Sequence, residues 1–232
     1  MTSSGPALNN GSMDRVPRER FLFRRIVVYR TGIKRLLDII ISATALILLS
    51  PLFVILSIFV YATMGSPILF RQKRVGKDKK VFEMMKFRSM TSKKDANGEL
   101  LPDRDRLTKT GDFLRKTSLD EIPELLNVLK GDMSIVGPRP LLVEYLPYYT
   151  ERENLRFQAR GGLIPPDALY GSVTPTWDNQ LEFEAEYVEK LSFRNDVKII
   201  LKTFGLLFKR VESDFGQYER ESLSTERERK NG

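Results

Sequence analysis

The sequence contains no cysteine and no histidine. Without cysteine the chain forms neither disulfides nor thiolate metal sites, which is typical of proteins in a reducing compartment. Without histidine it lacks the commonest general base and the commonest zinc ligand. Acid–base or metal chemistry must therefore use carboxylates, whose oxygen atoms favour a hard cation such as Mg2+.

Charge is plentiful, with 38 basic against 30 acidic residues in 232 and a formal net charge of +8. A chain of this length suits one domain with a sizeable core. A basic balance fits nucleic acid, an anionic membrane surface or a phosphate-rich substrate. Because aromatic and basic residues are not interleaved in the manner of RNA-binding proteins, we expect no nucleic acid partner.

Charge is absent from one segment, the 26 residues from Ile39 to Met64. A straight helix of that length measures about 39 Å, enough to cross a hydrocarbon core of roughly 30 Å. Near its middle lies Ser50-Pro51, and a proline there removes one helical hydrogen bond and favours a kink. The Ser50 hydroxyl can bond a carbonyl that the proline leaves free.

The flanks of this segment bear on its topology, because basic residues lie on both sides. They are Arg24, Arg25, Arg30, Lys34 and Arg35 before it and Arg71, Lys73, Arg74, Lys77, Lys79 and Lys80 after it. A spanning helix usually has its basic excess on one side only. A helix–break–helix that enters the membrane and returns, with arms of about 18–20 Å, accounts for both flanks. A single spanning helix is the alternative.

The remaining pattern predicts short elements. Residues 67–90 read as two extended segments around a turn at 76–78, and residues 91–110 as a surface loop. Helices are expected at 111–117, at 123–130 with Gly131 as its end, on both sides of Pro147 within 141–158, and at 182–190, with mostly loop across 159–180.

The last part of the chain combines a basic amphipathic segment with a charged tail. Residues 196–210 predict a helix that lies either in the membrane interface or on the soluble core. The Ser-rich, charged tail at 212–232 is expected to be disordered. The same is expected of the basic N-terminal segment 1–29, whose first twelve residues look foreign to the natural chain.

An adjacent carboxylate pair, Asp120-Glu121, stands at the start of the helix predicted before Gly131. Ser118-x-x-Glu121 matches a capping box, and taken alone the pair is more typical of a helix cap. The same helix start would also attract a phosphate and keep Asp120 ionised. An ionised carboxylate can attack phosphorus and form an acyl phosphate, so both interpretations stay open at this point.

Such an attack needs cations around the phosphate oxygens. Those available near the pair or in neighbouring motifs are Lys86, Arg88, Arg115 and Arg139. Singly, each is more typical of a surface charge. Arg139 lies between Pro138 and Pro140, whose rigid backbone fixes its direction, and it is the strongest candidate.

Five blocks of sequence resemble the bacterial sugar transferases, specifically the small monotopic phosphoglycosyl transferases. They are Lys34–Asp38 with Ser50-Pro51, Phe70–Gly76, Lys86–Met90, Leu114–Glu121 and Gly131–Leu141. The resemblance covers about residues 30–210. It implies an α/β, mostly helical, compact monotopic membrane domain on the inner leaflet, with interfacial amphipathic helices. On this reading residues 30–66 form the re-entrant helix, broken at Ser50 and Pro51, and residues 67–211 the catalytic domain.

The resemblance also implies an activity: transfer of a phospho-sugar from a UDP-sugar to polyprenol phosphate, in particular undecaprenyl phosphate, with release of UMP. In the family's ping-pong mechanism Asp120 would attack the β-phosphorus and bind Mg2+. Glu121 would assist, as a base or with the metal. Lys86, Arg88, Arg115 and Arg139 would bind substrate. The expected location is the cytoplasmic face of the bacterial inner membrane, at the first membrane step of glycan assembly.

One stretch departs from the family. Arg160–Gly171 keeps Arg160, Gly162 and Leu163 but lacks the Thr-Gly, Ala-Gln and Gly-Arg-Asn elements. The donor sugar is therefore not predicted, and the oligomeric state is left open, with a homo-oligomer among the options. The alternatives are a membrane scaffold of a glycan assembly complex that has lost its chemistry, and a basic protein that binds membrane surfaces or nucleic acid.

Overall fold

The computed structural model describes residues 28–170, 176–210 and 221–231. The predicted N-terminal segment 1–29 lies outside the described residues except for its last two, which are helical.

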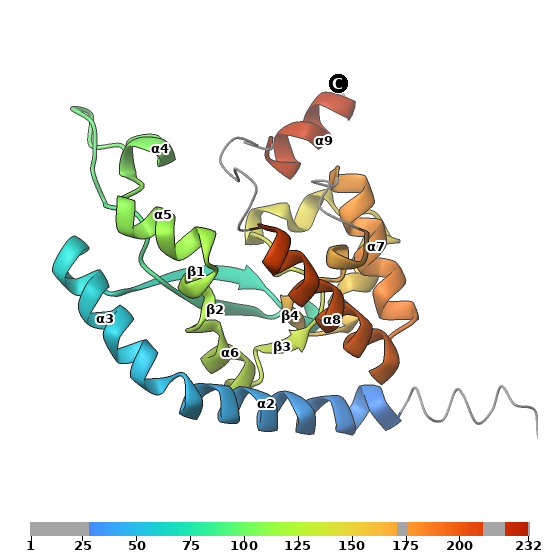
Figure 1. Cartoon of the computed structure of the whole chain (residues 1–232). Coiled ribbons are helices and arrows are strands. Elements are labelled where there is room, and N and C mark those ends of the chain that lie inside the picture. The colour runs from blue at the N-terminus through green and yellow to red at the C-terminus, as the bar shows by residue number, and fades with distance from the viewer. Residues whose placement is uncertain (1–27, 171–175, 211–220, 232) are drawn as a thin grey trace, which may run out of the picture.

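The N-terminal apolar segment forms a bent pair of helices (Figure 1). A short π-helical turn η1 (Tyr29–Ile33) leads into α2 (Lys34–Leu48), and α3 (Ser50–Met64) follows at a 64° bend. The Ser50 hydroxyl donates to the Ile47 carbonyl at 2.8 Å. Pro51 lies in the first turn of α3. Backbone N–H groups in a first turn have no acceptor within the helix, so the missing N–H of proline costs no helical hydrogen bond there. The predicted break is confirmed.

Membrane topology is constrained only by length and composition. Among the described helices none is by itself long and apolar enough to cross a bilayer, whereas α2 and α3 together pass that test as a bent pair.

The described residues form two two-stranded sheets. Strands β1 (Leu69–Val75) and β2 (Val81–Phe87) pair antiparallel, with η2 (Lys77–Lys79) in the turn between them, which confirms the predicted hairpin. Strands β3 (Met133–Val136) and β4 (Gly161–Ile164) pair in parallel. Mostly loop was predicted across 159–180, and for β4 within that range the prediction is wrong.

Close packing explains the glycines beside β3 and β4. A Cβ on Gly162 would lie 2.0 Å from the backbone nitrogen of Gly137, so a side chain at this position would force the two segments apart. The glycines that make this stretch resemble a loop are therefore required by the strand pairing.

The helices and turns surround these sheets (Figure 1). They are α4 (Asp103–Arg106), α5 (Lys109–Lys116), η3 (Leu119–Glu121), α6 (Glu124–Lys130), η4 (Val143–Tyr148), η5 (Glu153–Gln158), η6 (Pro166–Tyr170), α7 (Trp177–Glu189), α8 (Phe193–Arg210) and α9 (Leu223–Asn231). Gly131, in the left-handed region at φ 98°, ends α6 as predicted. The segments around Pro147 are helical, but as tight 3-10 turns.

Helix α9 corrects the prediction of a disordered tail for the part of 212–232 that the structure describes. Leu223 is fully buried in an apolar cluster that also contains Trp177 and Leu181. Arg227 pairs with Glu153 at 2.5 Å and with Asp178 at 2.9 Å. One apolar anchor and specific ion pairs order a segment whose composition alone favours disorder.

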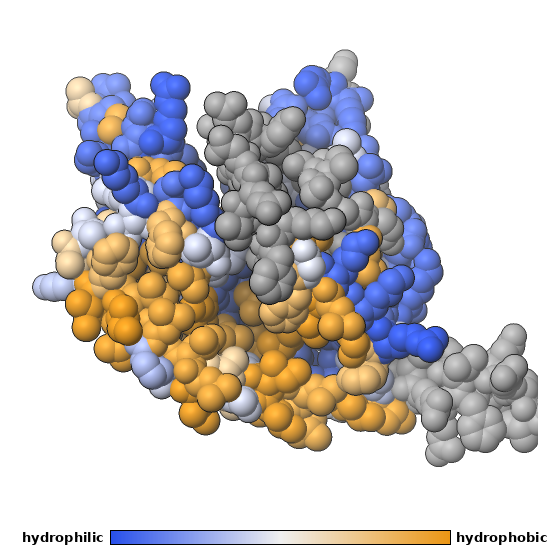
Figure 2. All heavy atoms as spheres, viewed as in Figure 1, coloured by the Kyte–Doolittle hydropathy of each residue, from blue (hydrophilic) through white to orange (hydrophobic). Residues whose placement is uncertain are grey.

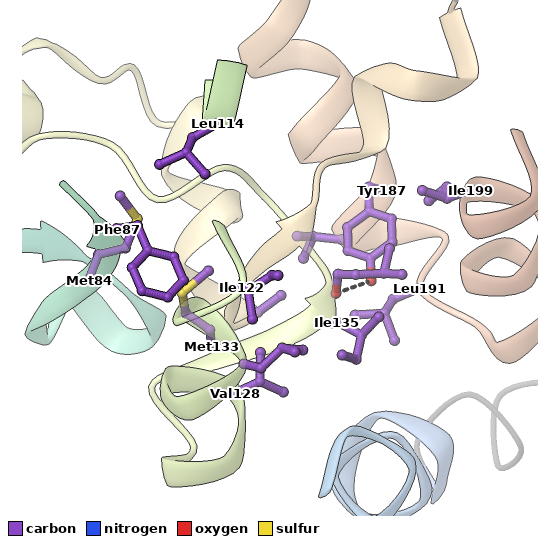
Figure 3. Close-up of a cluster of buried hydrophobic side chains, with 14 of the residues drawn as sticks. Met84, Phe87, Leu114, Ile122, Val128, Met133, Ile135, Tyr187, Leu191 and Ile199 are labelled. Carbon is purple, nitrogen blue, oxygen red and sulfur yellow. Dashed lines mark hydrogen bonds between the residues drawn. The ribbon is translucent and has the colours of Figure 1, made fainter. Parts of the chain in front are cut away.

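The main core lies between β2, α6, β3, α7 and α8 (Figure 3). Leu114, Val128, Met133 and Ile199 are completely buried there. The Tyr187 hydroxyl donates to the Val136 carbonyl at 3.1 Å, so this ring brings no unpaired polar atom into the core.

Buried polar contacts join α2 to the rest of the domain. Asp38 accepts hydrogen bonds from the Ser134 hydroxyl at 3.0 Å and the Ile135 N–H at 2.9 Å. Lys34 forms an ion pair of 2.6 Å with Asp196 at the start of α8. These contacts fix α2 against β3 and α8.

The outer side of α2 and α3 is apolar. Figure 2 shows hydrophobic residues gathered along the side of the molecule that these helices form, opposite the more polar α4, α7 and α9. Its exposed large residues are Ile33 at the end of η1 and, on the two helices, Leu36, Ile39, Ile40, Ile41, Ile47, Leu48, Val54, Ile55, Ile58, Phe59 and Tyr61. We call this set the apolar face. A patch of this extent on a soluble surface indicates an interaction site.

Candidate active site

Asp120 lies on the short turn η3, between α5 and α6. Ser118 precedes it in the left-handed region (φ 55°), and its side chain makes no capping hydrogen bond. Helix α6 begins only at Glu124, after Pro123. The capping-box interpretation of Ser118 and Glu121 is therefore wrong, and the carboxylate pair needs another explanation.

The Asp120 carboxylate is buried but open to a partner. Its residue is 7 % exposed, and among the described residues no other group donates a hydrogen bond to its side chain. Burial raises the pKa of Asp120, with Glu121 adding to the rise and Lys86 and Arg115 opposing it. Burial therefore outweighs the nearby cations in its effect on the pKa of Asp120, and the expectation that this carboxylate is ionised stays a prediction.

Lys86 on β2 bridges two carboxylates. Its ammonium lies 2.7 Å from Glu121 and 3.2 Å from Glu124. Glu124 is 4 % exposed, and burial raises its pKa to about 7, with Lys86 opposing the rise. The sequence prediction missed Glu124. The available signal was its place four residues after Asp120, which is helical spacing.

The two arginines predicted near the pair differ in what they contact. On α5, the Arg115 Nε donates to the Ser89 hydroxyl at 3.0 Å, and the side chain is exposed. Arg88, in contrast, donates to the Met64 and Ser66 carbonyls at 3.2 and 3.3 Å. Arg88 thereby ties the end of α3 to β2. These contacts favour a structural role for it, and its predicted substrate contact stays a prediction.

Arg139 lies in the Pro138-Arg139-Pro140 turn after β3. Its N–H donates to Glu184 at 3.1 Å, and its carbonyl accepts a hydrogen bond from Arg156. Its side chain is exposed and forms no hydrogen bond or ion pair with a described residue. The guanidinium is therefore available to an anion.

A further arginine lies beside this turn. Arg74, near the end of β1, pairs through its backbone with Leu142, two residues after Pro140. Burial lowers the pKa of Arg74, and Arg139 adds to that effect while Tyr145 and Glu124 oppose it. Arg74 thus belongs to the same charged region, although the sequence prediction gave it no role. A small hollow beside it is lined by Gly76, Pro138, Arg139, Phe157 and Gly161, among others.

The carboxylates fit a magnesium ion of the kind that binds with substrate. The described residues contain no cluster of three or more metal-ligating side chains, so a cage built by the protein alone is not found in them. Mg2+ commonly uses one or two carboxylates together with substrate phosphates and water. Glu121 and Glu124 are engaged by Lys86, which leaves Asp120 as the open carboxylate.

Comparison with known proteins identifies the family, because the model of the bacterial sugar transferases matches residues 29–210. The chain belongs to the bacterial sugar transferase family. It is 43 % identical over 171 residues to a Bacillus subtilis protein described as the uncharacterized sugar transferase EpsL, covering 74 % of this chain and 85 % of that protein.

Two further relatives carry named activities. One is UDP-glucose:undecaprenyl-phosphate glucose-1-phosphate transferase of Klebsiella pneumoniae, 37 % identical over 73 % of this chain and 39 % of that protein. The other is undecaprenyl-phosphate galactose phosphotransferase of Salmonella typhimurium, 35 % identical over 77 % of this chain and 41 % of that protein. The chain therefore matches less than half the length of these two bacterial sugar transferases.

Proposed function

We propose that this bacterial sugar transferase moves a phospho-sugar from a UDP-sugar to undecaprenyl phosphate and releases UMP. The names of its relatives support the reaction class. The observation that carries the proposal is the open Asp120 carboxylate beside the Lys86–Glu121–Glu124 cluster, with Arg115 nearby. The exposed guanidinium of Arg139 adds a further cation on the neighbouring turn.

The chemistry proceeds in two displacements. In the first, an Asp120 oxygen bonds to the β-phosphorus of the donor while the bond from that phosphorus to the UMP oxygen breaks. Arg115 and Arg139 bind the donor's phosphate oxygens. Mg2+, held by Asp120 and the donor phosphates, would neutralise further negative charge.

In the second displacement an oxygen of the lipid phosphate attacks the same phosphorus and releases Asp120. The Lys86 ammonium, 2.7 Å from the Glu121 carboxylate, holds Glu121 next to Asp120 in the chain. From this position Glu121 accepts the proton of the incoming lipid phosphate. Burial raises the pKa of Asp120, whereas Lys86 and Arg115 oppose the rise and so favour the ionised form that acts as the nucleophile.

The acceptor lipid requires contact with a bilayer. We propose that α2 and α3 form a re-entrant hairpin whose apolar face enters the inner leaflet from the cytoplasmic side, so that the domain is monotopic. The 64° bend, the exposed apolar residues and the basic residues on both flanks support this. The reaction then serves as the first membrane step of glycan assembly.

The test is UMP release in the presence of Mg2+, undecaprenyl phosphate and a panel of UDP-sugars. We expect release with at least one donor, loss on chelation of the metal, and loss in Asp120→Asn. The matched control is Asp112→Asn on α5, because that carboxylate pairs on the surface with Lys116 at 2.9 Å and forms no ion pair with the site among the described residues. Absence of UMP with every donor, or equal rates in the wild type and Asp120→Asn, contradicts the proposal.

A further inference from the structure

Both backbone hydrogen-bonding groups of Arg139 are bound by one buried ion pair. Glu184 on α7 accepts from the Arg139 N–H at 3.1 Å. Arg156 on η5 donates to the Arg139 carbonyl and, through Nε, to Glu184 at 2.8 Å. The three residues form a closed ring of contacts that joins three separate segments of the chain.

The ion pair of Arg156 and Glu184 is deeply buried, and both side chains make further hydrogen bonds. The side chains of Arg156 and Glu184 are 2 % and 1 % exposed. Arg156 also donates to the Tyr149 hydroxyl at 2.9 Å, and Glu184 also accepts from the Gln180 amide at 3.1 Å. Burying two charges is costly unless every partner is in place, so such a pair specifies one arrangement of the groups around it.

This arrangement determines how Arg139 is presented. Prolines on both sides restrict the backbone of Arg139, and the ion pair fixes its N–H and carbonyl. Its side chain, by contrast, forms no hydrogen bond or ion pair with any described residue. The direction of the free guanidinium therefore depends on the backbone clamp.

We propose that Arg156 and Glu184 are positioning residues that orient Arg139 toward the phosphates of the UDP-sugar donor. This inference rests on the proposed function. Neither residue touches the donor: both act through the Pro138-Arg139-Pro140 turn. The substitution that tests it is Glu184→Gln, which keeps the shape but offers one acceptor and one amide donor where the carboxylate offers two acceptors. At least one contact of the ring is then lost.

A matched control is available on the same helix. Glu189 on α7 also pairs with an arginine, Arg152, at 2.6 Å, but both side chains are more than two-fifths exposed, and among the described residues neither is hydrogen-bonded to the turn. Glu189→Gln makes the same chemical change without disturbing Arg139. We expect it to behave as the wild type in both measurements that follow.

The first measurement does not depend on activity. Because proline has no N–H, the amide of Arg139 is the only one within Pro138-Arg139-Pro140, and its hydrogen exchange can be assigned directly. We expect slow exchange in the wild type and in Glu189→Gln, and exchange at least about tenfold faster in Glu184→Gln. If the Arg139 amide exchanges at the same rate in Glu184→Gln and Glu189→Gln, the ion pair does not hold the backbone of Arg139, and the inference is wrong.

The second measurement separates positioning from general damage. We expect donor kcat/KM for UMP release to fall about tenfold in Glu184→Gln, as expected when a charged contact is weakened. In an Arg139→Gln background the same substitution is expected to cause no further loss, because its effect runs through Arg139. An equal loss in both backgrounds shows a merely structural role and overturns the inference.

The two measurements distinguish this inference from the proposed function. If the wild type releases no UMP from any UDP-sugar, the proposed function fails, and the exchange of the Arg139 amide still decides whether the clamp exists. If the wild type is active and Glu184→Gln matches Glu189→Gln in exchange and in kcat/KM, only the positioning inference fails.

Discussion

Replacing Glu124 by glutamine should make the protein more stable at alkaline pH. Glu124 is 4 % exposed, and its pKa of about 7 lies above the ordinary value of 4.5. Between those two values the folded protein binds a proton that the unfolded chain has released. The free energy of unfolding therefore falls as pH rises through this range and is not recovered above it.

The magnitude follows from the two pKa values of Glu124. A difference between about 7 and 4.5, at 1.36 kcal/mol for each pKa unit, corresponds to about 3 kcal/mol. Glutamine resembles the protonated form and avoids this cost. We therefore expect Glu124→Gln to exceed the wild type by about 3 kcal/mol at pH 8 and to differ little from it below pH 5.

The assay is denaturant unfolding of both proteins in detergent micelles at a series of pH values, with the difference between them plotted against pH. Glu189→Gln is the control. The hydrogen bond from Arg152 lowers the pKa of Glu189, so this variant should be less stable than the wild type at high pH, whereas Glu124→Gln should be more stable. A difference between wild type and Glu124→Gln that does not change with pH, or a variant that is less stable at pH 8, refutes the described burial of Glu124.

Three further predictions follow from the fold and the site. Ile55→Glu on the apolar face should weaken binding to liposomes of anionic phospholipid at least about tenfold. Leu100→Glu, at a residue of similar exposure that lies outside α2 and α3, should not weaken it, and equal binding of both variants contradicts the membrane assignment. Leu223→Ala should lower the free energy of unfolding by about 2–5 kcal/mol in a denaturation assay, and no loss means that α9 does not pack as described. Lys86→Met should reduce UMP release at least about a hundredfold, since Glu121 loses its partner, and an unchanged rate rules out that pairing in the reaction.

Local signals in the sequence predicted the local elements. The break at Ser50-Pro51 follows from proline chemistry, the end of α6 from Gly131, and the hairpin of β1 and β2 from the turn between them. In each case the cause lies within a few residues. The strand β4 (Gly161–Ile164) could not be predicted in this way, because its pairing partner β3 lies more than twenty residues earlier.

The same distinction applies to the site. Asp120, Glu121 and Lys86 were predicted and lie together. Glu124 was missed because its role depends on Lys86, which contacts it from strand β2, far away in the sequence. Arg88 shows the reverse case: a cation next to a motif whose guanidinium is bound by backbone carbonyls that only the folded chain brings near.

The most direct measurement is the intact mass of the protein after incubation with Mg2+ and a UDP-sugar donor in the absence of lipid acceptor. The account predicts a gain equal to one phospho-sugar, located by peptide mapping at Asp120, absent from Asp120→Asn and removed by adding undecaprenyl phosphate. A wild-type protein that turns over with donor and acceptor, yet gains no mass at Asp120 with donor alone, contradicts the covalent mechanism.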